Sequence, residues 1–115
     1  MLKQTGLYVI TGGPGTGKTS LIEELERSGF KAVEEVAREI IKEQMQQGGE
    51  ALPWKDTVLY TELMLERSID SYLANAGNDG ILFFDRGIPD TLAYAALIGL
   101  PDKENIEQAV AKYRY

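Results

Sequence analysis

The chain has 115 residues, of which 43% are hydrophobic and 26% are charged, and its formal net charge is −6. A chain of this length forms one domain, and because it contains neither cysteine nor histidine, disulfides, thiolate metal sites and histidine-based catalysis are excluded. The basic residues are spread along an acidic chain, so we do not expect nucleic acid as the main ligand.

No apolar run approaches the roughly 20 residues that cross a bilayer. The N-terminal segment also lacks the charged, apolar and small-residue regions that make up a signal peptide. We therefore expect a cytoplasmic protein that has no membrane partner.

Strand-like and helix-like segments alternate along the chain. Short apolar runs rich in β-forming residues predict strands, and apolar residues at three- and four-residue spacing predict helices. The expected elements are a strand at 6–11, a helix at 18–28 ended by Gly29, a strand at 30–36, a helix at 37–47, a long helix at 53–76, a strand at 81–85, a helix at 90–98, and a last helix from an Asp102 N-cap to about Lys112. This order predicts an α/β fold in which helices cover both faces of a parallel sheet.

Only three strands are visible, which is few for a complete domain of this class. The last residues, Tyr113, Arg114 and Tyr115, have the character of the opening of a fourth strand. We therefore expect residues 1–115 to be the N-terminal part of a longer domain.

A phosphate-binding motif stands between the first strand and the first helix. Residues 12–19 read GGPGTGKT and match G-x-x-x-x-G-K-[ST] in full. Glycines let the backbone curl so that successive N–H groups face a polyphosphate, and the helix start adds its positive end. The expected cradle consists of Gly12, Gly13, Pro14, Gly15, Thr16, Gly17, Lys18, Thr19 and Ser20.

The motif predicts a three-layer P-loop NTPase fold that binds ATP or GTP with Mg²⁺. Lys18 is expected to contact the β- and γ-phosphates, and the Thr19 hydroxyl is expected to ligate the metal. The alternative is a glycine-rich turn between a strand and a helix that carries an exposed lysine.

Charged residues follow the second and third strands. Ligands of open α/β sheets bind beyond the carboxyl ends of the strands, so these side chains face the same crevice as the cradle. Asp85 closes an apolar strand, as a Walker-B-type aspartate does, and is expected to hold Mg²⁺. Arg86 beside it is expected to clamp a substrate anion. The alternatives are a helix-capping Asp85 and a structural pair of Arg86 with Asp85 or Glu35.

Glu35 is the candidate general base for an attacking hydroxyl. Glu34 competes for this role because neighbouring residues in a strand point to opposite faces, so only one of them can enter the crevice. Arg38 follows three residues after Glu35 and is expected to orient Glu35 or bind substrate, unless it forms a plain surface ion pair.

The aromatic residues of the predicted helices invite a base-stacking interpretation. Trp54, Tyr60 and Tyr72 stand at helical spacing with leucines and methionine, which favours core packing instead. Tyr94, which follows Asp90 and Thr91, is the one aromatic residue to test as a pocket wall.

Three segments together resemble the NadR-like AAA-type ATPase family, a branch of the P-loop kinases related to the ribosylnicotinamide kinase domain of NadR. They are GGPGTGKT, EVAR at 35–38 and FFDRGIPDTLAYA at 83–95, and the resemblance runs from Leu7 to Tyr115. It implies a kinase-like fold, use of ATP and magnesium, and phosphoryl transfer to a small molecule. By this likeness, Glu35 and Arg38 lie near the acceptor, and Asp85 with Arg86 matches the DR pair of nucleoside and nucleotide kinases.

Members of this family continue with two further strands, an arginine-bearing lid and an adenine-contacting loop, which this sequence lacks. In the related kinases the first strand lies between the third and the fourth, so the likeness implies that the first strand is an exposed edge here. Exposed apolar edges invite pairing with another chain. We therefore expect a homodimer through residues 6–11.

The leading functional hypothesis is an ATP-dependent small-molecule kinase with Lys18, Glu35, Asp85 and Arg86 as catalytic residues and a nucleoside-like acceptor. The second is a regulatory nucleotide switch that acts through a protein partner. The third, a nucleic-acid-associated ATPase, is disfavoured by the acidic charge.

Overall fold

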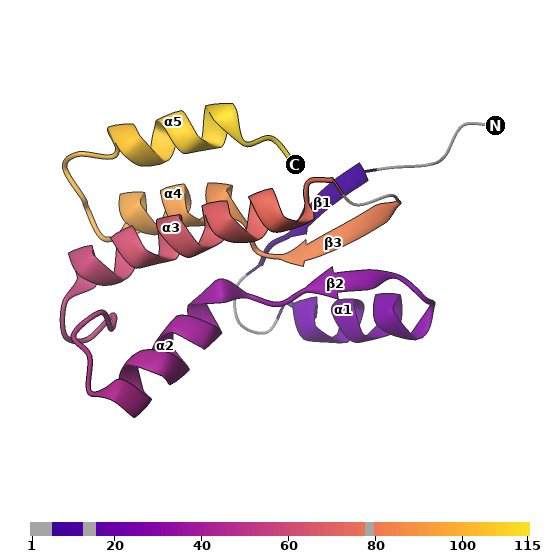
Figure 1. The fold of residues 1–115 in the computed structure, drawn as a ribbon, viewed down its shortest axis with the longest axis horizontal. Helices are drawn as coiled ribbons and strands as arrows, with labels where there is room; N and C mark the ends of the chain where they lie inside the picture. Colours follow the sequence, from indigo (N-terminus) through magenta and orange to yellow (C-terminus); the bar gives the residue numbers. More distant parts are fainter. Residues whose placement is uncertain (1–5, 13–15, 78–79) are drawn as a thin grey trace.

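The computed structural model describes residues 6–12, 16–77 and 80–115. The elements are β1 (Gly6–Ile10), α1 (Lys18–Arg27), β2 (Lys31–Val33), α2 (Val36–Gln47), α3 (Thr57–Asn75), β3 (Ile81–Asp85), α4 (Ile88–Leu97) and α5 (Glu104–Lys112). The strands form one parallel sheet in the order β1-β3-β2 (Figure 1). The predicted α/β fold with a parallel sheet is confirmed.

The third strand of the sequence, β3, lies in the middle of the sheet. Phe84 is in register with Val9 of β1 and Val33 of β2, and its side chain is 2% exposed. Such a central parallel strand is covered on both faces, which explains its continuous apolar sequence ILFFD. Because the strands are parallel, the residues that follow all three of them lie together at the carboxyl end of the sheet.

The main hydrophobic cluster lies just beyond this end of the sheet. Ile40 of α2 packs with Tyr60 and Met64 of α3, and Tyr94 of α4 covers them. In Figure 1, these three helices lie together on the side toward which the strands run. The core therefore supports the residues at the carboxyl ends of the strands.

The second strand is shorter than predicted. It ends at Val33, and Glu35 is already the N-cap of α2, with φ −64° and ψ 122°. The register explains this difference, because Val33 stands opposite Phe84 and only Asp85 remains of the central strand for further pairing. Glu34 and Glu35 thus lie in a connection and not in a strand.

The long helix starts later than predicted, and Trp54 is not a core residue. Asp56 caps α3 by accepting a hydrogen bond from Leu59 N at 3.0 Å, while residues 53–55 form a turn before it. A side-chain cap stabilises one particular helix start, whereas a proline is merely compatible with the first turn of a helix. As a result, the Trp54 side chain is 63% exposed.

The last two helices begin close to their predicted positions. α4 starts at Ile88, before the expected Asp90, because Gly87 N donates to Asp90 Oδ2 at 2.8 Å and Asp90 N donates to Gly87 O. α5 starts at Glu104 with Lys103 as its N-cap, one residue after the predicted Asp102. Asp102 still supports this start, because its Oδ1 accepts a hydrogen bond from Glu104 N at 3.1 Å. The end of α5 at Lys112 is as predicted.

The C-terminal residues, expected to open a fourth strand, join no strand within the part of the chain that the structure describes. The Tyr115 ring packs instead against Phe84, at 4.9 Å between centroids, and against Tyr72, at 5.0 Å. Its hydroxyl accepts a hydrogen bond from Ile88 N at 3.0 Å. These contacts bury the ring, and burial raises the pKa of Tyr115 above its usual value.

Among the described residues, every helix is too short or too polar to cross a bilayer.

Candidate functional site

The turn after β1 needs glycine at both of its described ends. Gly12 has φ +156°, and a Cβ built there would lie 2.6 Å from the Thr16 hydroxyl oxygen. Gly17, the N-cap of α1, has φ +83°. The predicted cradle residues Gly13, Pro14 and Gly15 lie outside the described residues. The described part therefore has the tight, glycine-dependent backbone that a phosphate cradle requires.

The N-terminus of α1 directly follows this turn. Gly17 offers no side-chain cap, and the first turn contains no acidic residue that would compete with an anion. Thr19 and Ser20 of the same turn are exposed. The first N–H groups of a helix have no partner within the helix, and its positive end attracts anions. This end of α1 can therefore hold a phosphate group.

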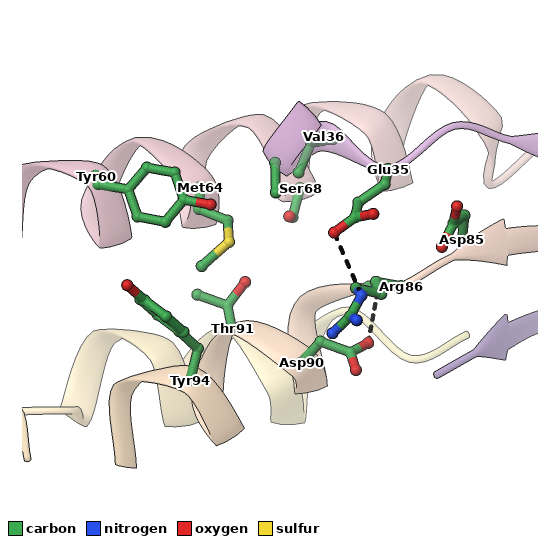
Figure 2. Close-up of a pocket in the computed structure, with 12 residues that line it drawn as sticks. Glu35, Val36, Tyr60, Met64, Ser68, Asp85, Arg86, Asp90, Thr91 and Tyr94 are labelled. Atoms are coloured by element: carbon green, nitrogen blue, oxygen red, sulfur yellow. Dashed lines mark hydrogen bonds and ion pairs between the residues drawn. The ribbon is translucent and has the colours of Figure 1, made fainter. Parts of the chain in front are cut away.

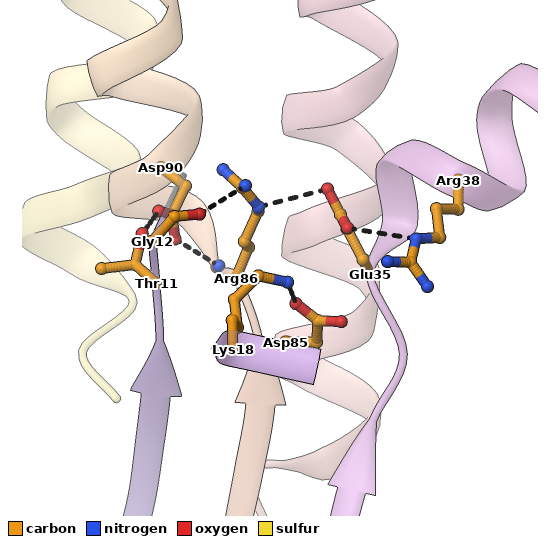
Figure 3. A network of polar contacts seen from close by, with 9 residues as sticks. Thr11, Gly12, Lys18, Glu35, Arg38, Asp85, Arg86 and Asp90 are labelled. Atoms are coloured by element: carbon orange, nitrogen blue, oxygen red, sulfur yellow. Dashed lines mark hydrogen bonds and ion pairs between the residues drawn. The ribbon is translucent and has the colours of Figure 1, made fainter. Parts of the chain in front are cut away.

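Lys18 is ion-paired with Asp85 at the edge of the sheet (Figure 3). The two side chains are only 9% and 12% exposed. The sequence predicted that both residues face one crevice, and the structure brings them together. In this state, the ammonium group lies on the carboxylate, which provides a local counter-charge for an otherwise costly buried cation.

Arg86 connects the cradle to the end of β2. One of its terminal nitrogens donates to Gly12 O at 2.7 Å, and its Nε lies 3.3 Å from Glu35 Oε1 (Figure 3). Glu35 Oε2 in turn lies 3.6 Å from Arg38 Nε. The pair of Arg86 with Glu35, one of the open alternatives, is therefore present. The Arg38 side chain is 71% exposed, so it is the outer member of this chain of charges.

The backbone of Arg86 is in the left-handed region, with φ +65°. Among the residues that the structure describes, it is the one non-glycine residue with positive φ. This conformation costs a residue with a Cβ about 1–2 kcal/mol and often occurs at functional sites. The Arg86 Nε is also buried and makes no hydrogen bond within the described part of the chain. In this strained conformation, the guanidinium group of Arg86 lies between Gly12 and Glu35.

Asp90 is a site residue that the sequence reasoning missed. It accepts a hydrogen bond from the Thr11 hydroxyl and another from Gly87 N, so it ties the end of β1 to the start of α4. Its spacing of three residues from Gly87 is a capping signal that could have revealed it. Glycine at the N-cap made this signal hard to recognise, because the usual pattern begins with serine or threonine.

A pocket of about 110 Å³ opens beside this polar network (Figure 2). Glu35, Arg86 and Asp90 bound it at the sheet edge, while Tyr60 and Tyr94 wall its far end. The rings of the two tyrosines meet edge to face, with 5.8 Å between centroids. Burial raises the pKa of both phenols, so they stay neutral at physiological pH. The predicted role of Tyr94 as a pocket wall is confirmed.

The walls from α3 were not predicted from the sequence. Met64 and Ser68 line the pocket together with Tyr60, and Thr91 of α4 faces them. Ser68 and Thr91 are 4% and 1% exposed. The predicted core packing of Tyr60 is also correct, since its ring belongs to the hydrophobic cluster and lines the pocket as well.

The AAA domain family matches residues 7–115. The chain belongs to the AAA domain family. It is therefore a nucleotide-binding protein of the P-loop type, as the motif at residues 12–19 predicted. No curated protein and no solved structure matched the chain.

In this AAA domain, Glu34 and Glu35 face two different pockets. Glu35 lines the pocket beside Arg86, whereas the exposed Glu34 lines a second cavity of about 200 Å³ together with Thr19 and Asp85. The expectation that only one of them enters the crevice rested on strand alternation, which does not apply because β2 ends at Val33. Each glutamate therefore borders its own part of the site.

The residues present fit a nucleotide with a hard metal ion. The described residues contain no cluster of three or more acidic side chains that could hold a metal without help. Thr19 and Asp85, which line the same cavity, supply two oxygen ligands of the kind that Mg²⁺ accepts. Mg²⁺ usually takes its other ligands from phosphates and water, so such a partial set suits a metal that arrives with a nucleotide.

Proposed function

We propose that this AAA domain transfers a phosphoryl group from ATP or GTP to the hydroxyl group of a small, nucleoside-like acceptor, with Mg²⁺ as the cofactor. The observation that supports this proposal is the pocket of about 110 Å³ between Glu35, Arg86 and the two tyrosines. One residue, Arg86, contacts both Gly12 at the start of the cradle and Glu35 in the pocket wall. An organic acceptor needs a pocket of its own beside the nucleotide, whereas a water molecule, the acceptor in hydrolysis, does not.

The nucleotide side of this proposal rests on the start of α1. The N–H groups of its first turn and the cradle backbone would hold the phosphates, and Lys18 would turn from Asp85 toward them. Thr19 and Asp85 would then hold the metal. Bound ATP or GTP supplies the phosphoryl group, and Mg²⁺ neutralises its charge. The Lys18–Asp85 pair thus keeps both residues oriented until the ligand is present.

The acceptor side rests on Glu35 and the two tyrosines. The Glu35 carboxylate would accept the proton of the acceptor hydroxyl, and Arg86 and Arg38 hold this carboxylate from two sides. Arg86 would also bind negative charge on the substrate. Tyr60 and Tyr94 offer flat apolar faces beside buried hydroxyl-bearing residues, which suit a small molecule that is part ring and part polar.

The resemblance to the NadR-like branch supports the same assignment. The EVAR and DRGIPD segments that carry this resemblance contain Glu35, Arg86 and Asp90, which line one pocket. They also contain Arg38, which is ion-paired with Glu35 and lines the neighbouring cavity. We further propose that residues 1–115 form the N-terminal part of a longer kinase-like domain, and that the protein works in the cytoplasm.

The test is a nucleotide-consumption assay with a panel of nucleosides as candidate acceptors. We expect ADP or GDP formation that requires Mg²⁺ and rises when the correct acceptor is added, together with a phosphorylated acceptor detected by mass spectrometry. Consumption at the same rate with and without every acceptor, and release of free phosphate only, would contradict a transferase.

The second candidate function is a regulatory nucleotide switch. The Lys18–Asp85 pair favours it, because a nucleotide that binds Lys18 must break this contact and thereby creates two states. A switch would hydrolyse nucleotide slowly without an acceptor and would bind a protein partner in only one nucleotide state. A pull-down performed with ATP and then with ADP separates the switch from the kinase.

A further inference from the structure

A groove on the side of α3 away from the nucleotide site has no role in the proposed reaction. It encloses about 530 Å³ between α3 and the segment that leads from α4 into α5. Apolar side chains of Val58, Leu65 and Ile69 form one wall, and Leu100 with Ile106 forms the other. Val58, in the first turn of α3, is 48% exposed, which is high for a valine.

The wall that α3 provides is a regular stripe. Val58, Glu62, Leu65 and Ile69 recur at four-, three- and four-residue spacing, so they lie along one face of the helix. At a rise of 1.5 Å per residue, this stripe is about 16 Å long, or three helical turns. A groove of this length and composition fits a short amphipathic helix that inserts its apolar face.

The rim of the groove is acidic. Glu62, Glu66 and Asp102 line it, and none of its described lining residues is basic. Lys103, next to Asp102, donates to Leu100 O at 2.9 Å, so one ammonium group stands near these three carboxylates. Three carboxylates around an apolar floor select a partner that carries positive charge beside its apolar face.

We propose that this groove is a docking site for a basic amphipathic helix of a partner protein. The apolar residues of the partner helix would fill the space between α3 and α5. Its lysines or arginines would lie close to the three carboxylates. The same helix α3 presents Tyr60, Met64 and Ser68 to the pocket on its other side, so the partner would bind directly behind a wall of the substrate pocket. This inference does not depend on which reaction the nucleotide site performs.

The test uses a fluorescein-labelled, helix-forming peptide with leucines at three- and four-residue spacing and lysines on the flanks of the leucine stripe. Fluorescence anisotropy is measured with the whole chain. We expect saturable binding that weakens as salt is added, because salt screens charges at the rim. A matched peptide with glutamate in place of each lysine should not bind.

Two variants and one control locate the peptide. The double variant Glu62→Lys/Glu66→Lys should weaken the lysine peptide roughly tenfold or more, since two attractive contacts become repulsive. Val58→Asn replaces an apolar side chain of the groove wall with a neutral polar one at a half-exposed position, and should also weaken binding. Glu107→Lys changes an exposed carboxylate of α5 that does not line the groove, and should bind like the unmodified protein.

Three results would overturn the proposal. They are no binding of the lysine peptide, equal binding of the lysine and glutamate peptides, and equal binding by the double variant and the Glu107→Lys control. Self-association of the chain that Val58→Asn abolishes would assign the groove to a second copy, and would overturn the proposal as well. Circular dichroism of each variant verifies that lost binding does not reflect lost folding.

Discussion

Lys18 and Asp85 stand 67 residues apart in the sequence and form an ion pair at the edge of the sheet. Lys18 opens the first helix, and Asp85 closes the central strand. The two residues expected to bind phosphate and metal thus neutralise each other when neither ligand is present. In the proposed reaction, a bound nucleotide would replace this ion pair instead of adding to it.

Lys18→Ala should abolish nucleotide binding. The substitution removes the cation expected at the phosphates and leaves the Asp85 carboxylate unpaired and largely buried. A ligand at 100 times its Kd stabilises a protein by about 2.7 kcal/mol, so ATP with Mg²⁺ should raise the Tm of the original chain measurably. The variant should show no such rise. Lys55→Ala, which changes an exposed lysine before α3, is the control and should keep the full shift.

Glu35→Gln should slow phosphoryl transfer by roughly 100- to 10,000-fold, the usual contribution of a general base. Nucleotide binding should be retained, because Glu35 lines the pocket beside Arg86 and not the cavity beside Thr19. Glu34→Gln is the matched variant, since the structure places Glu34 in that other cavity. Rapid-quench measurement of a single turnover distinguishes the two glutamates. A normal transfer rate for Glu35→Gln would remove Glu35 from the role of base.

Arg86→Gly should be more stable than Arg86→Ala by about 1 kcal/mol, although both substitutions remove the guanidinium group. The reason is the backbone, because φ at this position is +65° and glycine adopts this conformation without a steric penalty. Urea denaturation of the two variants measures the difference. Both should lose transfer activity, since both break the contacts with Gly12 and Glu35. Equal stability of the two variants would show that the strain is absent.

Protonation of Glu43 should contribute to the loss of folding stability in acid. Arg67 donates two hydrogen bonds to Glu43, at 2.8 and 3.1 Å, and ties α2 to α3. These bonds lower the pKa of Glu43 below its usual value of 4.5. A lowered pKa means that the stabilising contribution is present above the unfolded-state pKa and is lost as pH falls through the folded-state pKa.

Glu43→Gln should therefore reduce stability at neutral pH and flatten the loss of stability between neutral and acidic pH. Urea midpoints at a series of pH values measure both effects. Glu50→Gln changes an exposed glutamate in the connection after α2, and should leave the acid dependence unchanged. If Glu43→Gln and the original chain lose stability in parallel, the ion pair does not contribute.

The chain should dimerise through β1. This strand lies at the edge of the described sheet, and Tyr8 within it is 52% exposed. We propose that two copies pair along this edge. Light scattering after size exclusion should show a dimer at high concentration, and Tyr8→Lys should shift it toward monomer, because a charge on an edge strand opposes pairing. A clean monomer at every concentration would count against this pairing.

The cradle and the strand-end charges could be predicted because their signals are local. GGPGTGKT is a contiguous motif, and Asp85 with Arg86 directly follows an apolar strand. The rule that parallel strands share one carboxyl edge then places Lys18, Glu35 and Asp85 together. The partners within this group did not follow from the rule, since the geometry of side chains decides that Lys18 pairs with Asp85 and Arg86 with Glu35.

The walls of the pocket could not be predicted, because they depend on how helices pack. Tyr60 and Tyr94 are separated by the central strand in sequence, and only the packing of α3 against α4 brings their rings together. Trp54 was predicted to pack in the core but is exposed. Its apolar character fitted the helical period, but the Asp56 cap starts the helix after it, and a residue outside the helix is not bound by that period.

The position of β3 between its two neighbours divides the site into halves of unequal rigidity. Asp85 and Arg86 extend from a strand whose backbone is hydrogen-bonded on both sides, whereas Gly12 extends from β1, which is paired on one side only in the described sheet. Amide hydrogen exchange should accordingly be slowest at β3 and faster at β1. The backbone of β1, which leads into the cradle, should then open locally before that of the central strand.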